Sequence, residues 1–177
     1  MPRSLCDSAV RNQGRNQGRN QGRAVGLAAG LLAVAGTLAL APAPAPVTAP
    51  ASRSDLRLVQ AAADPAVPGG QTLLRALVAN GGPDVTASPF TVTVLLPPHT
   101  TDLGGDFPSS CADSAAGTTV SCTFPPGLPQ LRTAIVEIRL LVGGDVRPGT
   151  VLSGGGVTVA SPDGPSCDHR PYSIQVR

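Results

Sequence analysis

The chain has 177 residues, enough for one domain with an appendage. Its net charge of +2 is divided unevenly along the sequence. Five Arg against one Asp give +4 in residues 1–51, whereas eight Arg against ten acidic residues give −2 in residues 52–177. A nucleic-acid-binding domain concentrates its basic side chains on one face, and the second part of the chain scatters them. We therefore do not expect nucleic acid to be a partner.

The first 51 residues have the three parts of a secretory signal peptide. Residues 1–23 are basic and of low complexity, with three copies of Arg-Asn-Gln-Gly followed by Arg23. Residues 24–41 form an uncharged apolar run, and residues 42–51 are rich in Ala and Pro. Arginines that precede an apolar run hold their side of it in the cytoplasm, so the chain after the run is translocated. We expect export of residues 52–177, with cleavage between Ala51 and Ser52.

An uncleaved signal anchor is the alternative for the same segment. The apolar run has 18 residues, which is the lower end of what spans a bilayer. Its many Ala and Gly residues make it weakly hydrophobic, and this favours cleavage. In the alternative, residues 24–41 tether the domain to the membrane, and this N-terminal segment is the only membrane contact that the sequence predicts.

From residue 54 onward the apolar residues follow the pattern of short β-strands separated by Gly/Pro turns, and no stretch has a helical period. The predicted strands span residues 55–59, 71–80, 90–96, 118–124, 134–142, 151–152, 157–159 and 172–176. Seven or eight short strands with such turns predict an all-β domain, an immunoglobulin-like Greek-key β-sandwich over residues 52–177.

The alternation within these strands predicts which side chains face the core. Thr91 and Thr93 are expected to face outward, because they alternate with three large apolar residues. Arg75 shares a face with Leu73 and Leu77, so it is expected to reach solvent at an edge or over a rim. The triplet Gly154–Gly156 predicts a bulge or bend between strands, since no helix follows it to form a phosphate loop.

Three cysteines lie in the body of the chain. Cys111 and Cys122 flank the turn Ala115-Ala116-Gly117, so we expect them to face each other across a hairpin and to form a disulfide, which export favours. Closing this loop stabilises the fold by about 3 kcal/mol in the chain-entropy model. Cys167 is then left over, either as a buried free thiol or as a site for a bond to a second molecule.

Several motifs in the body resemble the DUF11-type repeat of bacterial surface and secreted proteins. The motifs are Val67-Pro68-Gly69, a strand from Gln71, Asn80-Gly81-Gly82-Pro83, Leu96-Pro97 and the Cys111…Cys122 hairpin. The resemblance covers residues 54–177, although the acid usual before Leu-Pro is missing and Asp168-His169-Arg170 replaces an asparagine pair. It implies an immunoglobulin-like spacer or adhesive module. All 13 basic residues are Arg, and this skew is typical of GC-rich genomes such as those of actinobacteria.

The body shows no motif for catalysis. The sequence lacks Gly-x-Ser-x-Gly, HExxH and a phosphate-binding glycine loop. His99 and His169 stand beside prolines and are expected to be solvated loop residues. Acidic residues form two groups, either of which has the oxygens that Ca²⁺ prefers, but neither has a recognisable ligand spacing, and solvated loop acids are the favoured interpretation. These residues are Asp102, Asp106 and Asp113 near the hairpin, and Asp163 and Asp168 near the C-terminus.

The sequence thus predicts an exported, non-enzymatic structural or interaction module at the cell envelope or outside the cell, with no metal and no cofactor. Its partner is expected to be an envelope or extracellular protein or polymer, bound through an exposed sheet edge or the loops at one end of the sandwich. Two alternatives are a secreted carrier of a small apolar ligand, which requires an apolar pocket, and a secreted protease inhibitor, which requires a rigid exposed loop braced by a disulfide.

Overall fold

A computed structural model of the chain describes residues 52–163 and 167–177. This part contains nine β-strands and no helix. The strands are β1 (Leu56–Ala63), β2 (Gln71–Asn80), β3 (Phe90–Leu95), β4 (Thr100–Asp102), β5 (Cys111–Asp113), β6 (Thr119–Phe124), β7 (Thr133–Val142), β8 (Val151–Ala160) and β9 (Cys167–Gln175). The predicted signal peptide, residues 1–51, lies outside the described residues. Among the residues that are described, no helix is long and apolar enough to cross a membrane.

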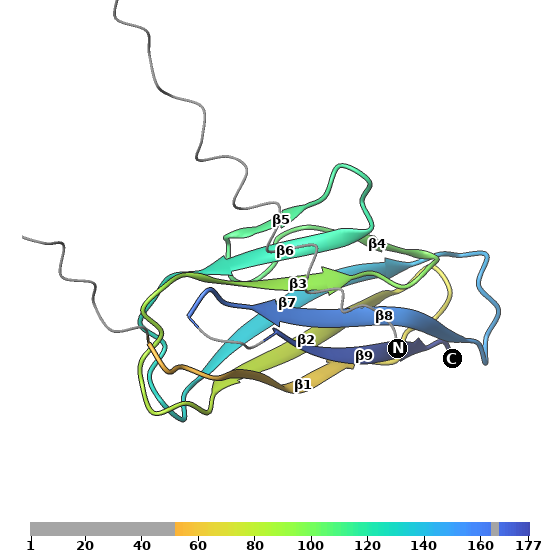
Figure 1. Cartoon of the computed structure of the whole chain (residues 1–177). Helices are drawn as coiled ribbons and strands as arrows, with labels where there is room; N and C mark the ends of the chain where they lie inside the picture. Colours follow the sequence, from red (N-terminus) through yellow and green to blue (C-terminus); the bar gives the residue numbers. More distant parts are fainter. Residues whose placement is uncertain (1–51, 164–166) are drawn as a thin grey trace, which may run out of the picture. The chain divides into compact units, whose positions relative to one another are not determined.

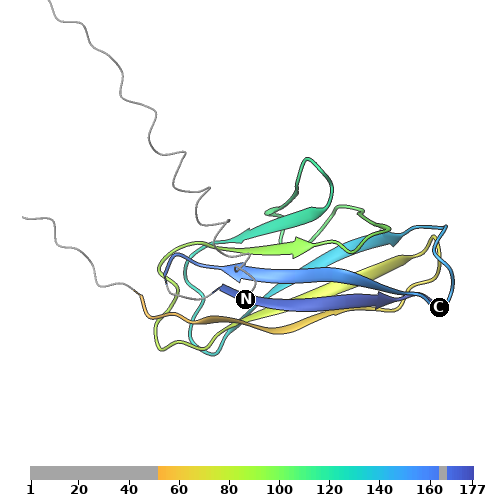
Figure 2. The same cartoon turned by 45° about the vertical axis from the view of Figure 1, so that its right-hand side comes forward.

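The strands form two antiparallel sheets that stack face to face (Figures 1 and 2). The four-stranded sheet has the order β1-β2-β7-β4, and the five-stranded sheet has the order β5-β6-β3-β8-β9. The chain crosses between the sheets several times, so neighbouring strands come from distant parts of the sequence. This architecture confirms the predicted all-β, immunoglobulin-like sandwich.

The core lies between the sheets and is built from alternate residues of each strand, as a half-buried strand requires. In β3, Phe90, Val92 and Val94 are buried and Thr91 and Thr93 face outward, as predicted. Aliphatic side chains supply most of the buried apolar surface. The phenyl rings of Phe90 and Phe124 stack at 4.9 Å between centroids, which is within the range of favourable aromatic pairs.

Four strand predictions differ from the structure. β1 continues to Ala63, four residues beyond the predicted end, because a bulge after Leu58 interrupts the alternation on which the prediction relied. The short edge strands β4 and β5 were not predicted, because three residues are too few to show a period. β8 is one strand in which a bulge between Leu152 and Gly155 absorbs the glycine triplet, so the two segments predicted there are joined. β9 begins at Cys167, five residues earlier than predicted, because Pro171 is tolerated in an edge strand, where its missing N–H need not pair.

Arg75 reaches solvent by a different route from the one predicted. Its strand, β2, lies inside the four-stranded sheet, and Arg75 stands on the outer face of that sheet, not at an edge. The guanidinium pairs with Glu137 of β7 at 3.1 Å and with Asp64 at 3.6 Å. Leu73 and Leu77 flank it on this face and are half-buried.

A buried asparagine fastens the loops at one end of the sandwich. The Asn80 side chain, at the end of β2, is fully buried. Its Oδ1 accepts hydrogen bonds from the backbone N–H groups of Asp55 at 3.1 Å and Gly82 at 3.0 Å. Its Nδ2 donates to the carbonyls of Asp84 at 2.8 Å and Leu128 at 3.0 Å. One side chain thus satisfies four backbone groups from three separate segments.

The edges of β1 and β9 approach each other along one side of the sandwich. The carboxylate of Asp168 accepts a hydrogen bond from the backbone N–H of Leu58 at 2.8 Å, beside a bulge in β1. Arg170 donates from its guanidinium to the carbonyl of Val59 at 3.2 Å. These side chains occupy backbone groups that an unprotected edge would offer to another strand.

Candidate functional site

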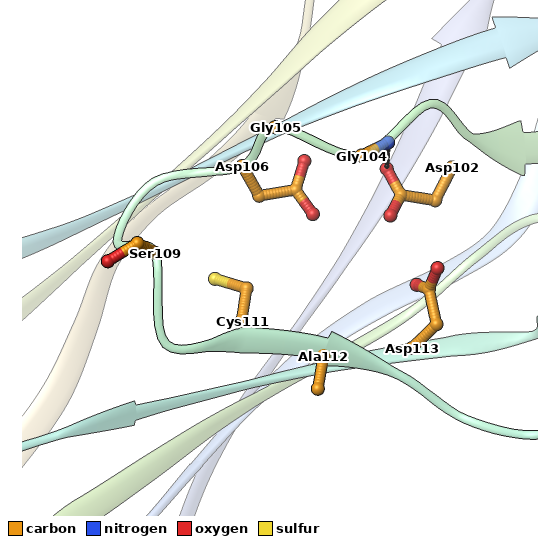
Figure 3. Close-up of a pocket in the computed structure, with 8 residues that line it drawn as sticks. All are labelled: Asp102, Gly104, Gly105, Asp106, Ser109, Cys111, Ala112 and Asp113. Carbon is orange, nitrogen blue, oxygen red and sulfur yellow. Dashed lines mark hydrogen bonds between the residues drawn. The ribbon is translucent and has the colours of Figure 1, made fainter.

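The opposite side of the sandwich holds a pocket between the two sheets. We call it the acidic pocket (Figure 3). Its volume is about 250 Å³, and it lies where the chain leaves β4 in one sheet and reaches β5 in the other. It is lined by Asp102, Gly104, Gly105, Asp106, Ser109, Cys111, Ala112 and Asp113.

The crossover segment takes its shape from two glycines and an arginine. Gly104 and Gly105 both have φ of +70°, which favours glycine over residues that carry a Cβ. Asp102 accepts a hydrogen bond from the Gly104 N–H at 3.0 Å. The guanidinium of Arg139 donates to the Gly104 carbonyl through Nη2 at 2.6 Å and Nε at 3.2 Å. A Cβ on Gly105 would overlap that guanidinium.

A disulfide fixes the far wall of the pocket. Cys111 of β5 and Cys122 of β6 are directly opposite each other in the pairing of these strands and are bonded. The predicted pairing is therefore confirmed. Cys167, at the first residue of β9, is not a free thiol in the structure. The free-thiol alternative is therefore wrong, and a bond from Cys167 to a second molecule stays a prediction.

Three carboxyl groups point toward one another across the pocket (Figure 3). Burial, and then the negative charges of Asp102 and Asp113, raise the pKa of Asp106 from the usual 3.8 to about 6. The hydrogen bond from the Arg139 backbone N–H opposes this shift. The pKa of Asp113 is also raised. Burial is the largest cause, and the neighbouring carboxyl of Asp102 adds to it. The pocket thus holds a proton more readily than isolated aspartates do.

The acidic pocket is small and is lined by three interacting carboxyl groups. Asp102 contributes to the raised pKa of both Asp106 and Asp113. The volume is below the roughly 300–1,000 Å³ of typical small-molecule sites. Within residues 52–163 and 167–177, no group of three or more His, Cys, Asp or Glu side chains is placed to hold a metal ion. Three of the eight lining residues are aspartates, so this pocket is poorly suited to the small apolar ligand of a carrier.

The second acidic group is structural. The carboxylate of Asp163 accepts hydrogen bonds from the backbone N–H groups of Ala87 at 2.6 Å and Ser88 at 2.8 Å. Burial raises the pKa of Asp163, but the hydrogen bonds from the Ser88 side chain and from the two backbone N–H groups outweigh it, so the pKa is lowered overall. Asp168 bonds to β1 as described above. The interpretation of both as solvated loop acids is therefore wrong, and the sequence carried no signal of partners so far away.

The two histidines lie in different surroundings. His99 is a loop residue between β3 and β4, as predicted, with its Nδ1 3.4 Å from the exposed Asp145 carboxylate. His169 lies in strand β9, which corrects the prediction that it is a loop residue. Its Nδ1 is 3.0 Å from the Thr158 hydroxyl on the neighbouring strand β8. Both side chains are exposed.

The outer face of the five-stranded sheet differs in charge from the outer face of the four-stranded sheet. The strand registers place its outward residues in three rows, and none of them is Asp, Glu, Lys or Arg. We call this surface the hydroxyl face, since six of its residues are Thr or Ser. It consists of Thr91, Thr93, Leu95, Ala112, Thr119, Ser121, Thr123, Gly156, Thr158, Ala160, Cys167, His169 and Pro171. The other outer face carries Arg57, Arg75, Glu137 and Arg139.

The comparisons with known proteins identify the fold. No family model and no characterised protein sequence matches the chain. The third cohesin of ScaC from Acetivibrio cellulolyticus, solved with the ScaB dockerin, has a TM-score of 0.51 and 12% identity, over 68% of this chain and 98% of that one. The collagen-binding subdomain ACE19 of the Enterococcus faecalis surface protein ACE has a TM-score of 0.47 and 7% identity, over 66% and 94%. At 12% identity, the likeness to the cohesin shows the fold alone, the immunoglobulin-like β-sandwich described above.

Proposed function

We propose that this chain is an exported, non-enzymatic interaction or adhesion module that acts at the bacterial cell envelope or outside the cell. The observation that carries the proposal is the hydroxyl face. A solvated sheet face ordinarily carries charged and polar side chains, whereas the buried centre of a protein interface is depleted of charge. A broad uncharged face on a domain with eighteen charged residues in its body is therefore suited to contact with another protein.

Two further observations support the proposal. The cohesin with this fold was solved in complex with a protein, the ScaB dockerin. The N-terminal segment has the pattern of a signal peptide, which supports export with cleavage between Ala51 and Ser52, or tethering through residues 24–41. The order of motifs from Val67 to Cys122 also supports assignment to the DUF11-type repeats.

Export is tested by mass spectrometry of culture medium, envelope and cytosol fractions. We expect a mature form that begins at Ser52 in the medium or envelope. Full-length chain confined to the cytosol would refute export.

Binding is tested with residues 52–177, since Ala51–Arg177 forms a compact unit by itself. We expect saturable binding to washed cell envelopes, measured as depletion from solution, and its loss in Thr93→Arg, which places a charge at the centre of the hydroxyl face. Thr133→Arg is the matched control, because Thr133 is exposed on the other sheet. Equal binding by both variants, or no binding by the unaltered domain, would contradict the proposal.

A further inference from the structure

We propose that the hydroxyl face binds the hydroxyl face of a second copy of this chain, in a two-fold symmetric pair. This inference rests on the proposed function, because it takes the same face as the binding surface and names its occupant. The argument uses the charge, the hydrogen-bonding groups and the area of that face.

Charge distinguishes a second copy from an unrelated partner. Around a two-fold axis each residue near the axis meets itself or a close neighbour, so any charge there meets a like charge. Contacts between different proteins gain specificity and association rate from opposite charges. The hydroxyl face carries no fixed charge in any of its three rows, which suits contact with its own copy.

The hydrogen-bonding groups of the face are complementary to themselves. A hydroxyl both donates and accepts, so a Thr or Ser on one copy can pair with the same residue on another. Along the middle row, the hydroxyls of Thr93 and Ser121 lie 3.5 Å apart, and the hydroxyl of Thr158 lies 3.0 Å from His169. These groups run across neighbouring strands and form a continuous strip through the centre of the face.

Small residues allow two such faces to approach closely. The face includes the small residues Ala112, Gly156 and Ala160. A Cβ on Gly156 would lie 2.6 Å from the His169 ring, so this ring lies close against the sheet. Stacked sheets pack at about 10 Å when their side chains are small enough to interdigitate. Thr93 stands at the centre of the face, on the middle strand β3, and the exposed Leu95 two residues further along that strand is the largest aliphatic side chain of the face.

The area of the face limits the strength of the pair. Four strand intervals of about 4.8 Å and about 14 Å along the strands, the span of three alternate residues, give about 270 Å² per copy. The total of about 540 Å² is well below the roughly 1,200–2,000 Å² of stable interfaces. The expected association is therefore weak and transient, and it should be detectable only at high protein concentration.

Sedimentation velocity of residues 52–177 over a concentration series tests the pair. We expect reversible dimerisation, at least a tenfold weaker association in Thr93→Arg and in Thr93→Glu, and no change in Thr133→Arg. Mixing the Thr93→Arg and Thr93→Glu proteins is expected to restore association, because opposite charges then meet at the axis. Thermal denaturation of each variant confirms that it is folded.

Three outcomes would overturn the pair. They are a monomer at every concentration, a dimer indifferent to both Thr93 substitutions, and a mixture of the two variants that remains monomeric. The first of these, together with Thr93-dependent binding to envelopes, would leave the proposed function standing with a different protein as occupant. A dimer that fails to bind envelopes would refute the proposed envelope contact alone.

Discussion

Replacing Asn80 with Ala should remove much of the stability of the fold. The substitution deletes four hydrogen bonds to the backbone in a fully buried position. A net hydrogen bond contributes about 1 kcal/mol, and a buried group left without a partner costs about 1–3 kcal/mol. Water reaches some of the freed loop groups, so we expect a loss of about 3–4 kcal/mol. That is a large part of the roughly 5–15 kcal/mol that stabilises a domain.

The charge variant Asn80→Asp separates the two halves of this network. Aspartate keeps an oxygen for the N–H groups of Asp55 and Gly82, but it turns a second oxygen toward the carbonyls of Asp84 and Leu128. We expect a loss at neutral pH at least as large as that of Asn80→Ala. Part of it should be recovered on acidification, because a protonated carboxyl can donate one hydrogen bond.

Urea denaturation of residues 52–177, with the disulfide intact, measures both variants. With a slope of about 1.5 kcal/mol/M, the expected loss lowers the midpoint by about 2 M. Gln71→Ala is the control, because Gln71 carries an amide on the same strand but is exposed. An Asn80→Ala midpoint within about 0.3 M of that control would refute the role assigned to Asn80.

Three further predictions concern the pocket, the disulfide and the glycine triplet. Because the pKa of Asp106 is raised to about 6 in the folded chain, its protonation stabilises the fold fully below about pH 3.8, and this contribution is lost as the pH rises through about 6. The difference in stability between Asp106→Asn and the unaltered chain should therefore change by on the order of 1 kcal/mol over that pH range, after allowance for solvent screening. A difference in urea midpoints that does not depend on pH would contradict this prediction. Replacing both Cys111 and Cys122 with Ser should cost about 3 kcal/mol in the same assay, and an unchanged midpoint would show that the bond adds nothing. Gly155→Ala places a Cβ about 2.7 Å from the Tyr172 ring, so thermal denaturation should show a loss of stability of about 1–3 kcal/mol. The double variant with Tyr172→Leu should lose less from the added Cβ, because the ring is then absent.

The sequence predicted those features that depend on local pattern. Period-two alternation located β2, β3, β6 and β7 and the inward side of β3, and the turn between Cys111 and Cys122 indicated their disulfide. The glycine triplet indicated a bulge, which the structure places within β8. Each signal lies within about a dozen residues, the range over which turn and strand preferences act.

Features made by contacts between distant segments were not predictable in this way. The carboxylate of Asp168 accepts a hydrogen bond from the backbone N–H of Leu58 in β1, which is 110 residues earlier in the chain. Asp163 likewise reaches the loop before β3, and both residues therefore resembled solvated loop acids. The grouping of Asp102, Asp106 and Asp113 was visible, but the raised pKa of Asp106 depends on burial, which only the crossover between the sheets creates.

The hydroxyl face shows the same limit in its strongest form. Thr is favoured in strands for its β-branched shape, so Thr91 or Thr93 alone indicates a strand and nothing about binding. The face is interpreted from the absence of charge across strands of three separate parts of the sequence, β3, β5–β6 and β8–β9, which become adjacent only in the fold. Since solvent-facing positions of the other sheet do carry charges, composition alone does not explain the difference. An uncharged outer face therefore points to a surface that is covered when the module acts, and a substitution that charges Thr93 is the most direct way to find what covers it.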